Sequence, residues 1–237
     1  MSSEGPDVAT RTVVVTGSSS GIGRSIAQHL LGQGWRVQGL DLAPATLQGE
    51  GFEAIRVDLS DASAIAQALP ALHGAQALVH AAGLLRVGVL GESDLADGDL
   101  MWRVHVQAAV ALANGLVPAM AQRRAGRVVL IGSRVAQGMP GRGQYAASKA
   151  AVIALARSWA SEVAPQGVTV NVVSPAATQT SMLDDPSRAA SAPRLPPIGR
   201  LIQPEEIAAT VAFLLSPSAA AITGQDIAVC GGASLPR

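Results

Sequence analysis

The chain has 237 residues, enough for one substantial domain with its own hydrophobic core. Its 17 basic and 17 acidic side chains give a formal net charge of zero, so the charge favours neither nucleic acid nor an anionic membrane as a partner. Cys230 is the one cysteine, which excludes an internal disulfide and fits a reducing cytoplasm.

The N-terminal residues are polar and lack the basic-then-apolar order of a signal peptide. We therefore expect a flexible arm over 1–10, ahead of a single domain over 11–237. Farther along, Asn114, Gly115 and Pro118 or charged residues interrupt the apolar stretches, so we expect none of them to span a bilayer. The histidines and carboxylates show no metal-ligand spacing, and we predict no metal site.

Short apolar runs typical of β-strands alternate with helical patterns along the chain. This alternation predicts a parallel sheet of about seven strands with helices on both faces, that is, a doubly wound α/β domain. The expected strands are 12–16, 35–40, 53–57, 76–80, 127–132, 168–174 and 225–229, and the expected helices are 21–33, 61–70, 99–122, 144–164 and 204–215. Ligands of such a domain lie beyond the carboxyl ends of the strands.

The first expected strand runs into a glycine-rich turn, TGSSSGIG, and a helix follows. Glycines permit a tight turn and let backbone N–H groups approach a pyrophosphate, and the helix N-terminus adds its positive dipole. Because the turn joins a strand to a helix, it predicts a dinucleotide site formed by Gly17, Ser19, Ser20, Gly21, Ile22 and Gly23.

The second expected strand ends at Asp41. A carboxylate there can accept hydrogen bonds from the adenosine ribose, whereas a 2′-phosphate would meet like charge. No arginine or lysine occupies the turn or follows Asp41, so the sequence favours NAD over NADP as cofactor. The alternative is a solvated acid at a strand end. About a dozen residues separate Asp41 from the third strand, so we expect the helix between them to be lost or shortened.

The chain contains one tyrosine and one lysine, Tyr145 and Lys149, four residues apart in an expected helix. That spacing puts both side chains on one face. An ammonium group beside a phenol favours the phenolate and lowers the phenol's pKa from its usual value near 10. The pair is therefore a candidate for proton transfer with a substrate hydroxyl or carbonyl, the alternative being a chance pairing on an amphipathic helix.

One long irregular stretch, about 175–203, is rich in proline, serine and alanine. A connection of this length in a compact domain is usually functional, and we interpret it as a lid over a substrate site. The alternative is an ordinary surface loop.

At this point the residues resemble the single-domain short-chain dehydrogenase/reductase family, over nearly the whole chain from Thr12 to Ser234. TGSSSGIG is similar to the family's TGxxxGxG signature and YAASK to its YxxxK. GRVVLIGS resembles the strand that delivers the family's serine, VNVVSPA the strand after the active-site helix, and QPEEIA and ITGQDIAVCGG the last helix and strand. The resemblance implies a Rossmann-type fold.

The resemblance also implies roles for individual residues. Tyr145 would be the general acid or base, Lys149 would lower its pKa and bind the nicotinamide ribose, and Ser133 would orient the substrate oxygen. The implied cofactor contacts further along the chain are Asp58, Leu59, Ala82, Gly83 and Thr180. Family members are commonly tetramers joined through the long helices and the last strand, so a homotetramer is expected.

Several positions depart from the family pattern. His105 stands where the family has an asparagine that helps to hold a water in the proton relay; a histidine can donate or accept, so we keep it among the catalytic candidates. The family's NNAG is replaced by His80-Ala81-Ala82-Gly83, where His80 is expected to be structural. Ala176 replaces the glycine of the PG turn, and Cys230 the aspartate of the final DGG.

Within the family, AAGLLRVG, NVVSPAAT and the closing ITGQDIAVCGGASL look most like the NAD-dependent branch that acts on dihydro-dihydroxybenzoate. In that context Arg86 is a candidate partner for a substrate carboxylate, with a surface arginine as the equal alternative.

The leading hypothesis is therefore a cytoplasmic NAD-dependent oxidoreductase that interconverts a secondary alcohol and a ketone, its substrate being a small molecule such as a cyclic diol or its carboxylate. A dinucleotide-binding sensor or scaffold that has lost catalysis is the alternative, supported by His105 alone. A methyltransferase has no use for YxxxK, and an extended-type epimerase normally adds a C-terminal substrate region that this chain lacks.

Overall fold

The computed structural model describes residues 11–184 and 195–235. The expected arm over 1–10 lies outside the described residues, as does the middle of the expected lid.

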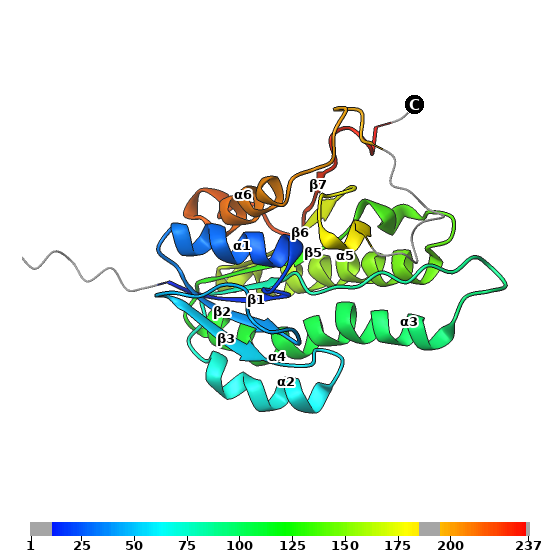
Figure 1. The fold of residues 1–237 in the computed structure, drawn as a ribbon. Coiled ribbons are helices and arrows are strands. Elements are labelled where there is room, and N and C mark those ends of the chain that lie inside the picture. Colours follow the sequence, from blue (N-terminus) through cyan, green and yellow to red (C-terminus); the bar gives the residue numbers. More distant parts are fainter. Residues whose placement is uncertain (1–10, 185–194, 236–237) are drawn as a thin grey trace, which may run out of the picture.

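The core of the fold is a parallel sheet of seven strands (Figure 1). In chain order these are β1 (Thr12–Thr16), β2 (Arg36–Asp41), β3 (Phe52–Arg56), β4 (Ala77–His80), β5 (Gly126–Ile131), β6 (Val168–Pro175) and β7 (Asp226–Val229). They lie side by side in the order β3-β2-β1-β4-β5-β6-β7. The predicted doubly wound α/β fold and its seven strands are confirmed, with strand ends within two residues of those expected.

Helices cover both faces of this sheet (Figure 1). They are α1 (Gly21–Gly32), α2 (Ala62–Ala68), α3 (Leu95–Trp102), α4 (Ala108–Gln122), α5 (Gly143–Val163) and α6 (Pro204–Leu215). Short 3₁₀ turns occur at Leu69–Leu72, Arg134–Gln137, Ala164–Gln166, Ser181–Asp184 and Pro217–Ala219. A π-helical turn, Arg103–Gln107, joins α3 to α4, so the helix expected at 99–122 is longer than predicted and is interrupted.

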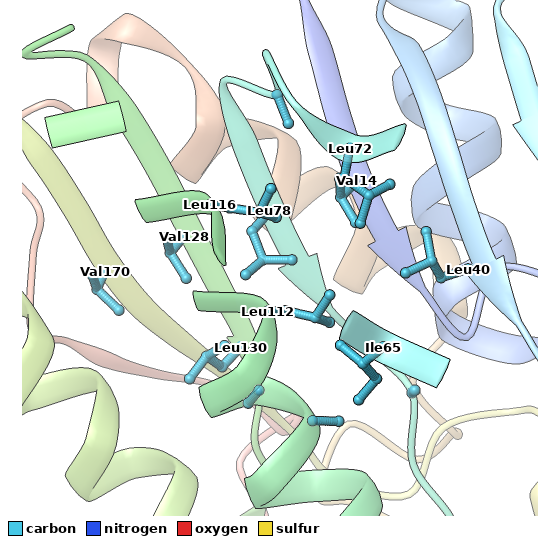
Figure 2. Close-up of a cluster of buried hydrophobic side chains, with 14 of the residues drawn as sticks. Val14, Leu40, Ile65, Leu72, Leu78, Leu112, Leu116, Val128, Leu130 and Val170 are labelled. Atoms are coloured by element: carbon cyan, nitrogen blue, oxygen red, sulfur yellow. The ribbon is translucent and has the colours of Figure 1, made fainter. Parts of the chain in front are cut away.

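Side-chain alternation along the strands divides the core into two layers. Val14 and Leu78 point to the layer under α2, α4 and α5, where they pack with Ile65 and Leu112 (Figure 2). Val13 and Val15 point to the other face, where α1 and α6 cover them with apolar side chains such as Ile26 and Val211. The central strands β1, β4, β5 and β6 are buried on both faces, which is why they read as continuous apolar runs in the sequence.

No helix separates β2 from β3: the chain runs through 42–51 without one, as the short spacing predicted. The strand order reverses between β1 and β4. From β1 the sheet extends through β2 and β3 to one edge, and from β4 it extends through β5, β6 and β7 to the other. In open α/β sheets, ligands bind at the carboxyl ends of the strands beside such a switch point.

Among the described residues, one segment, 95–122, is long and apolar enough to cross a membrane by length and hydropathy alone. The expectation that no stretch is long enough was therefore wrong by that measure. However, 44% of the segment's apolar window is buried inside the fold, and Ala108, Leu112 and Leu116 belong to the core layer. A core helix passes the same test, so the finding is weak evidence for a membrane span.

Candidate active site

A cavity of about 800 Å³ opens at the carboxyl ends of β1, β4, β5 and β6. Its volume is in the range of pockets that hold cofactors and small ligands. The structure brings most of the predicted site residues to its wall: Gly17, Ser20, Gly21, Ile22, Gly23, Ala82, Gly83, Ser133, Tyr145, Lys149 and Thr180.

The glycine-rich turn forms one end of the cavity. Gly17 has a φ of +69°, and a side-chain Cβ there would lie 2.9 Å from the Cα of Ala82. A Cβ on Gly23 would meet the carbonyl oxygen of Gly17, so a larger residue at either position would displace the backbone. Helix α1 then begins at Gly21, and no side chain caps its first N–H groups. The turn therefore fits the pyrophosphate of a dinucleotide.

The β1 end is tied to the β4 end through Thr16. Its hydroxyl oxygen accepts hydrogen bonds from the backbone N–H groups of Ala81 and Ala82, both at 3.0 Å. The same hydroxyl donates to Nδ1 of His80 at 3.0 Å. The switch point is thus held at a fixed width, since the two strand ends share one hydroxyl.

Asp41, at the end of β2, lies beyond the lining of the cavity. Its Oδ2 accepts the N–H of Ser19 at 2.9 Å and its Oδ1 accepts the N–H of Ala43 at 2.9 Å. These bonds fix the carboxylate beside the glycine-rich turn, and each oxygen keeps a lone pair for a further donor. Both ribose hydroxyls of an adenosine are donors of that kind.

Three other predicted cofactor residues also lie outside the cavity lining: Ser19, Asp58 and Leu59. Asp58 follows β3, where its Oδ1 accepts hydrogen bonds from the N–H and the hydroxyl of Ser60 at 2.8 and 2.7 Å. These bonds lower the pKa of the Asp58 carboxyl below its usual value. The Leu59 side chain is buried in the core layer, which leaves its backbone as the group available to an adenine.

The opposite end of the cavity holds the serine, tyrosine and lysine. Ser133 follows β5, and its hydroxyl oxygen accepts the N–H of Val135 at 3.1 Å, which leaves its proton available to another acceptor. Tyr145 and Lys149 stand one helical turn apart at the start of α5. The Lys149 ammonium lies 5.9 Å from the centre of the Tyr145 ring.

Lys149 is a buried cation of the site. Its Nζ donates to the carbonyl oxygen of Ile131 at 2.8 Å, at the end of β5. Burial disfavours the charged form and lowers the Lys149 pKa to about 8. An ammonium with a pKa this close to neutrality exchanges its proton more readily than an exposed lysine.

His105 lies in the π-helical turn with its ring edge toward Tyr145, the ring centres 5.6 Å apart at an interplanar angle of 88°. Its Nε2 accepts the N–H of Leu84 at 3.1 Å, so the ring proton is on Nδ1 and is donated to the hydroxyl of Ser148 at 2.9 Å. That hydroxyl in turn donates to the Tyr145 carbonyl oxygen at 2.8 Å.

These bonds assign His105 a specific state. Burial, then the charges of Lys149 and His80, lower the His105 pKa well below its usual value, so the ring is neutral. Both ring nitrogens are engaged with the backbone of Leu84 and the hydroxyl of Ser148. In this arrangement the ring supports the backbone around Tyr145 and has no nitrogen left for a proton relay to Lys149.

His80 is buried and bridges two elements. Its Nδ1 accepts from Thr16, so its Nε2 carries the proton and donates to the carbonyl oxygen of Val104, in the π-helical turn, at 3.0 Å. Burial and the charge of Lys149 lower the His80 pKa to about 4. These contacts agree with the structural role expected from the sequence.

Arg86, the predicted substrate-binding residue, also lies outside the cavity lining. Its Nε lies 3.3 Å from Oδ1 of Asp97, and both side chains are about 40% exposed. Sequence reasoning missed two other arginines, Arg134 and Arg142, which line the cavity. Arg142 could have been noticed, because it precedes Tyr145 by three residues at the start of a helix.

The parts of the expected lid that the structure describes form a wall of the cavity. Thr178, Thr180, Ser181 and Met182 contribute from its first part, and Leu195 and Pro196 from its last. A Cβ on Gly21 would lie 3.3 Å from Cγ2 of Thr180, so this segment closes over the glycine-rich turn. The described residues contain no group of three or more His, Cys, Asp or Glu side chains that could hold a metal ion.

One cavity here contains both a turn that fits a pyrophosphate and a phenol–ammonium pair. This arrangement is typical of dinucleotide-dependent oxidoreductases. Comparison with known proteins agrees. The family model described as enoyl-(acyl carrier protein) reductase matches residues 17–234. The 3-oxoacyl-(acyl-carrier-protein) reductase FabG of Vibrio cholerae is 35% identical over 236 residues, which cover 94% of this chain and 96% of that protein.

Other relatives and solved structures agree. The 2,3-dihydro-2,3-dihydroxybenzoate dehydrogenase of Escherichia coli is 35% identical over 250 residues, covering 97% of this chain and 99% of that enzyme. A solved short chain dehydrogenase/reductase family protein has a TM-score of 0.86 at 32% identity, covering 94% of this chain and 96% of its own. For the Thermoplasma acidophilum aldohexose dehydrogenase the TM-score is 0.88 at 26% identity, with 96% and 95% covered.

The chain therefore belongs to the short-chain dehydrogenase/reductase family. It is an oxidoreductase acting on CH–OH groups.

Proposed function

We propose that the protein is an NAD-dependent dehydrogenase that interconverts a secondary alcohol and a ketone. The observation that carries this proposal is the position of Ser133, Tyr145 and Lys149 on the wall of the same cavity as the glycine-rich turn. A bound nicotinamide ring would supply the hydride acceptor or donor, and the protein supplies position and proton transfer.

In the proposed mechanism, the substrate oxygen lies between the hydroxyl groups of Ser133 and Tyr145. Ser133 donates a hydrogen bond that orients this oxygen. During alcohol oxidation the Tyr145 oxygen takes the hydroxyl proton, and during ketone reduction it returns that proton. The Lys149 ammonium, 5.9 Å from the Tyr145 ring, stabilises the phenolate form by its charge. In this proposal Lys149 and Gly83, which line the same cavity, would also hold the nicotinamide ribose.

NAD is preferred over NADP in this proposal because of Asp41. Its carboxylate is fixed beside the turn by the N–H groups of Ser19 and Ala43. There it can accept from ribose hydroxyls and would repel a 2′-phosphate. Ser20, which lines the cavity at the turn, adds no positive charge that would favour the phosphate.

The proposed substrate is a small cyclic alcohol or diol, or its carboxylate. A relative of matching length is named for the oxidation of 2,3-dihydro-2,3-dihydroxybenzoate. Another is named for the reduction of a 3-oxoacyl thioester, so relatedness alone does not choose between them. A cytoplasmic location and a homotetramer remain predictions from the family resemblance.

The test is the absorbance of NADH formed when the purified protein meets NAD and a panel of secondary alcohols, with NADP in parallel. Tyr145→Phe should reduce turnover by at least a hundredfold while NADH binding, followed by fluorescence, stays within a factor of two. Retained turnover in that variant would refute the mechanism. Silence of the wild type across the panel, with NADH still bound, would instead favour a sensor or scaffold.

A further inference from the structure

The histidine of the π-helical turn joins two parts of the site that are far apart in the chain. On one side, Nε2 of His105 accepts the N–H of Leu84, the residue after Gly83. On the other side, its Nδ1 donates to the hydroxyl of Ser148, the residue before Lys149. His105 and Ser148 are 0% and 1% exposed, so water does not compete for the bond between them. His105 therefore connects the backbone after β4 to helix α5.

The Ser148 hydroxyl extends this connection to the reacting residue. Its own proton is donated to the carbonyl oxygen of Tyr145 at 2.8 Å. A hydroxyl has one proton and two lone pairs, so it can donate to Tyr145 and accept from His105 at the same time. The His105 ring also meets the Tyr145 ring edge-on, with the ring centres 5.6 Å apart. Both the backbone and the phenol ring of Tyr145 are thus placed with reference to one buried imidazole.

The other side of His105 is packed as closely. A Cβ on Gly83 would lie 3.2 Å from Nε2 of His105 and 3.6 Å from Nζ of Lys149. A glycine at this position therefore lets the imidazole and the ammonium approach the same piece of backbone. Gly83 and Lys149 both line the cavity. A shift of His105 would consequently move the backbone on the cofactor side as well as the backbone of Tyr145.

The π-helical turn that carries His105 is itself fixed by His80. Nε2 of His80 donates to the carbonyl oxygen of Val104 at 3.0 Å, and its Nδ1 accepts from Thr16 at the end of β1. Single π-helical turns inside helices occur frequently at functional sites. With the turn held and both ring nitrogens engaged, the His105 ring cannot rotate without breaking a buried hydrogen bond, which is costly.

We propose that His105 and Ser148 are positioning residues of the reaction, which together fix the distance between the cofactor-side backbone at Gly83 and the general acid or base Tyr145. His105 acts by holding these two parts of the site, and it takes no part in moving the proton. The inference rests on the proposed function, in which Tyr145 is the acid or base, and deepens it.

The first test removes the hydrogen bond to Tyr145 and leaves the imidazole in place. Ser148→Ala should lower kcat at least about tenfold, because a shift of about 1 Å in a reacting group can cost up to a hundredfold. Ser161→Ala is the matched control and should keep the wild-type kcat. Its hydroxyl also donates to a backbone carbonyl oxygen of α5, that of Arg157 at 3.1 Å, but it is exposed and lies far along the helix.

Equal kcat values in the two serine variants would overturn the proposal. That result is expected if His105 passes protons toward Lys149, since such a relay has no use for Ser148.

Two replacements of His105 separate its two hydrogen bonds. The amide nitrogen of asparagine lies as many bonds from Cβ as Nδ1 does, so His105→Asn can still donate to Ser148 but leaves the N–H of Leu84 unpaired. The amide oxygen of glutamine corresponds to Nε2, so His105→Gln can keep the bond to Leu84 and lose the one to Ser148. We expect His105→Asn to raise KM for NAD at least about fivefold, and His105→Gln to lower kcat as much as Ser148→Ala does.

The double variant Ser148→Ala/His105→Gln checks that the two residues act as one unit. It should lose no more kcat than the more impaired single variant, because both changes break the same chain of hydrogen bonds. Multiplied losses in the double variant would contradict the proposal, as would a fall in kcat confined to His105→Asn.

The sole tyrosine of the chain allows a test that needs no turnover. Tyr145 is the one tyrosine in the sequence, so the ultraviolet absorbance of tyrosinate during a pH titration reports the Tyr145 pKa alone. Ser148→Ala and His105→Gln should move the midpoint toward that of a free phenol, near 10, because the ring is no longer held beside the Lys149 ammonium. Residues that only stabilised the fold would leave the midpoint at the wild-type value, as Ser161→Ala should.

The titration also separates failure of the inference from failure of the proposed function. Shifted midpoints in a protein that oxidises no alcohol would leave the positioning role standing and remove the proposed function. Tyr145-dependent turnover, with midpoints unchanged in Ser148→Ala and His105→Gln, would leave the dehydrogenase standing and overturn the positioning role.

Discussion

The two ends of the cavity use different kinds of groups. The end formed by β1, α1 and β2 presents backbone: glycines that admit close approach, N–H groups at a helix start, and one fixed carboxylate. The end formed by β4, β5 and α5 presents side chains that titrate, with Lys149, His80 and His105 buried within it. We therefore expect cofactor binding to depend little on pH, whereas turnover and the stability of the fold should depend on it strongly.

The largest effect is expected from replacing Lys149, at the end of the cavity that holds the titrating side chains. Lys149→Met should reduce turnover at least a hundredfold, because the phenolate of Tyr145 loses its cation. The same change should stabilise the folded protein at pH 7. The Lys149 pKa falls from 10.5 to about 8 on folding, a burial penalty of about 3 kcal/mol. The lost hydrogen bond to Ile131 offsets about 1 to 2 kcal/mol of that gain.

The effect of Lys149 on stability also varies with pH, in a direction set by the protons that the folded and unfolded chains bind. Between pH 8 and 10.5 the unfolded chain binds the Lys149 proton and the folded chain does not, so wild-type stability rises with pH across that window. Urea denaturation at pH 7 and pH 9.5 measures both effects, and the methionine variant should lack this rise. A Lys149→Met protein less stable than the wild type at pH 7 would show that the bond to Ile131 outweighs the cost of burying the charge.

Acid should lower the free energy of unfolding through the buried histidines at the same end of the cavity. His80 is neutral when folded, with a pKa of about 4 against 6.5 for the free side chain, so its contribution is present above pH 6.5 and is lost as the pH falls toward 4. The loss amounts to about 3 kcal/mol at pH 4. His105 acts in the same direction, since its pKa is lowered too.

Urea midpoints measured between pH 7 and pH 4 follow this loss. His80→Asn should flatten the profile, whereas His73→Asn, at an exposed position, should reproduce the wild-type slope. Equal slopes in the His80→Asn variant and the wild type would assign the acid sensitivity to other groups.

The smallest effect is expected at the end of the cavity formed by β1, α1 and β2. Asp41→Asn keeps the size of the side chain and removes the charge that opposes a 2′-phosphate, so the preference for NAD over NADP should fall about tenfold. The measurement is the ratio of kcat/KM for the two cofactors. Asp58→Asn at the neighbouring strand is the matched control and should leave the ratio in place, because its carboxylate is bonded to Ser60. An unchanged ratio in Asp41→Asn would remove the electrostatic basis for the NAD preference.

Most of the fold could be predicted because its signals are local. Alternation of apolar runs and helical patterns identified all seven strands, and the missing helix after Asp41 followed from chain length alone. The candidate site was less accessible. Its glycines, Ser133, Tyr145 and Lys149 belong to short motifs and could be found, but Arg142 belongs to none, and the sequence pointed to Arg86 instead.

The same limit applies to the histidines. The sequence placed His105 at the position of a relay asparagine, but it carried no information on which ring nitrogen would be occupied. That depends on Leu84 and Ser148, which are 21 and 43 residues away in the chain.

The sequence by itself determined the sheet, the glycine-rich turn and the tyrosine–lysine pair, because backbone conformation and helical spacing are set by neighbouring residues. The tertiary structure alone decided which arginine faces the cavity, which histidine nitrogens carry protons and how far the Lys149 pKa is lowered. Those properties depend on burial and on partners distant in the chain, and both are created only when the strands and helices pack together.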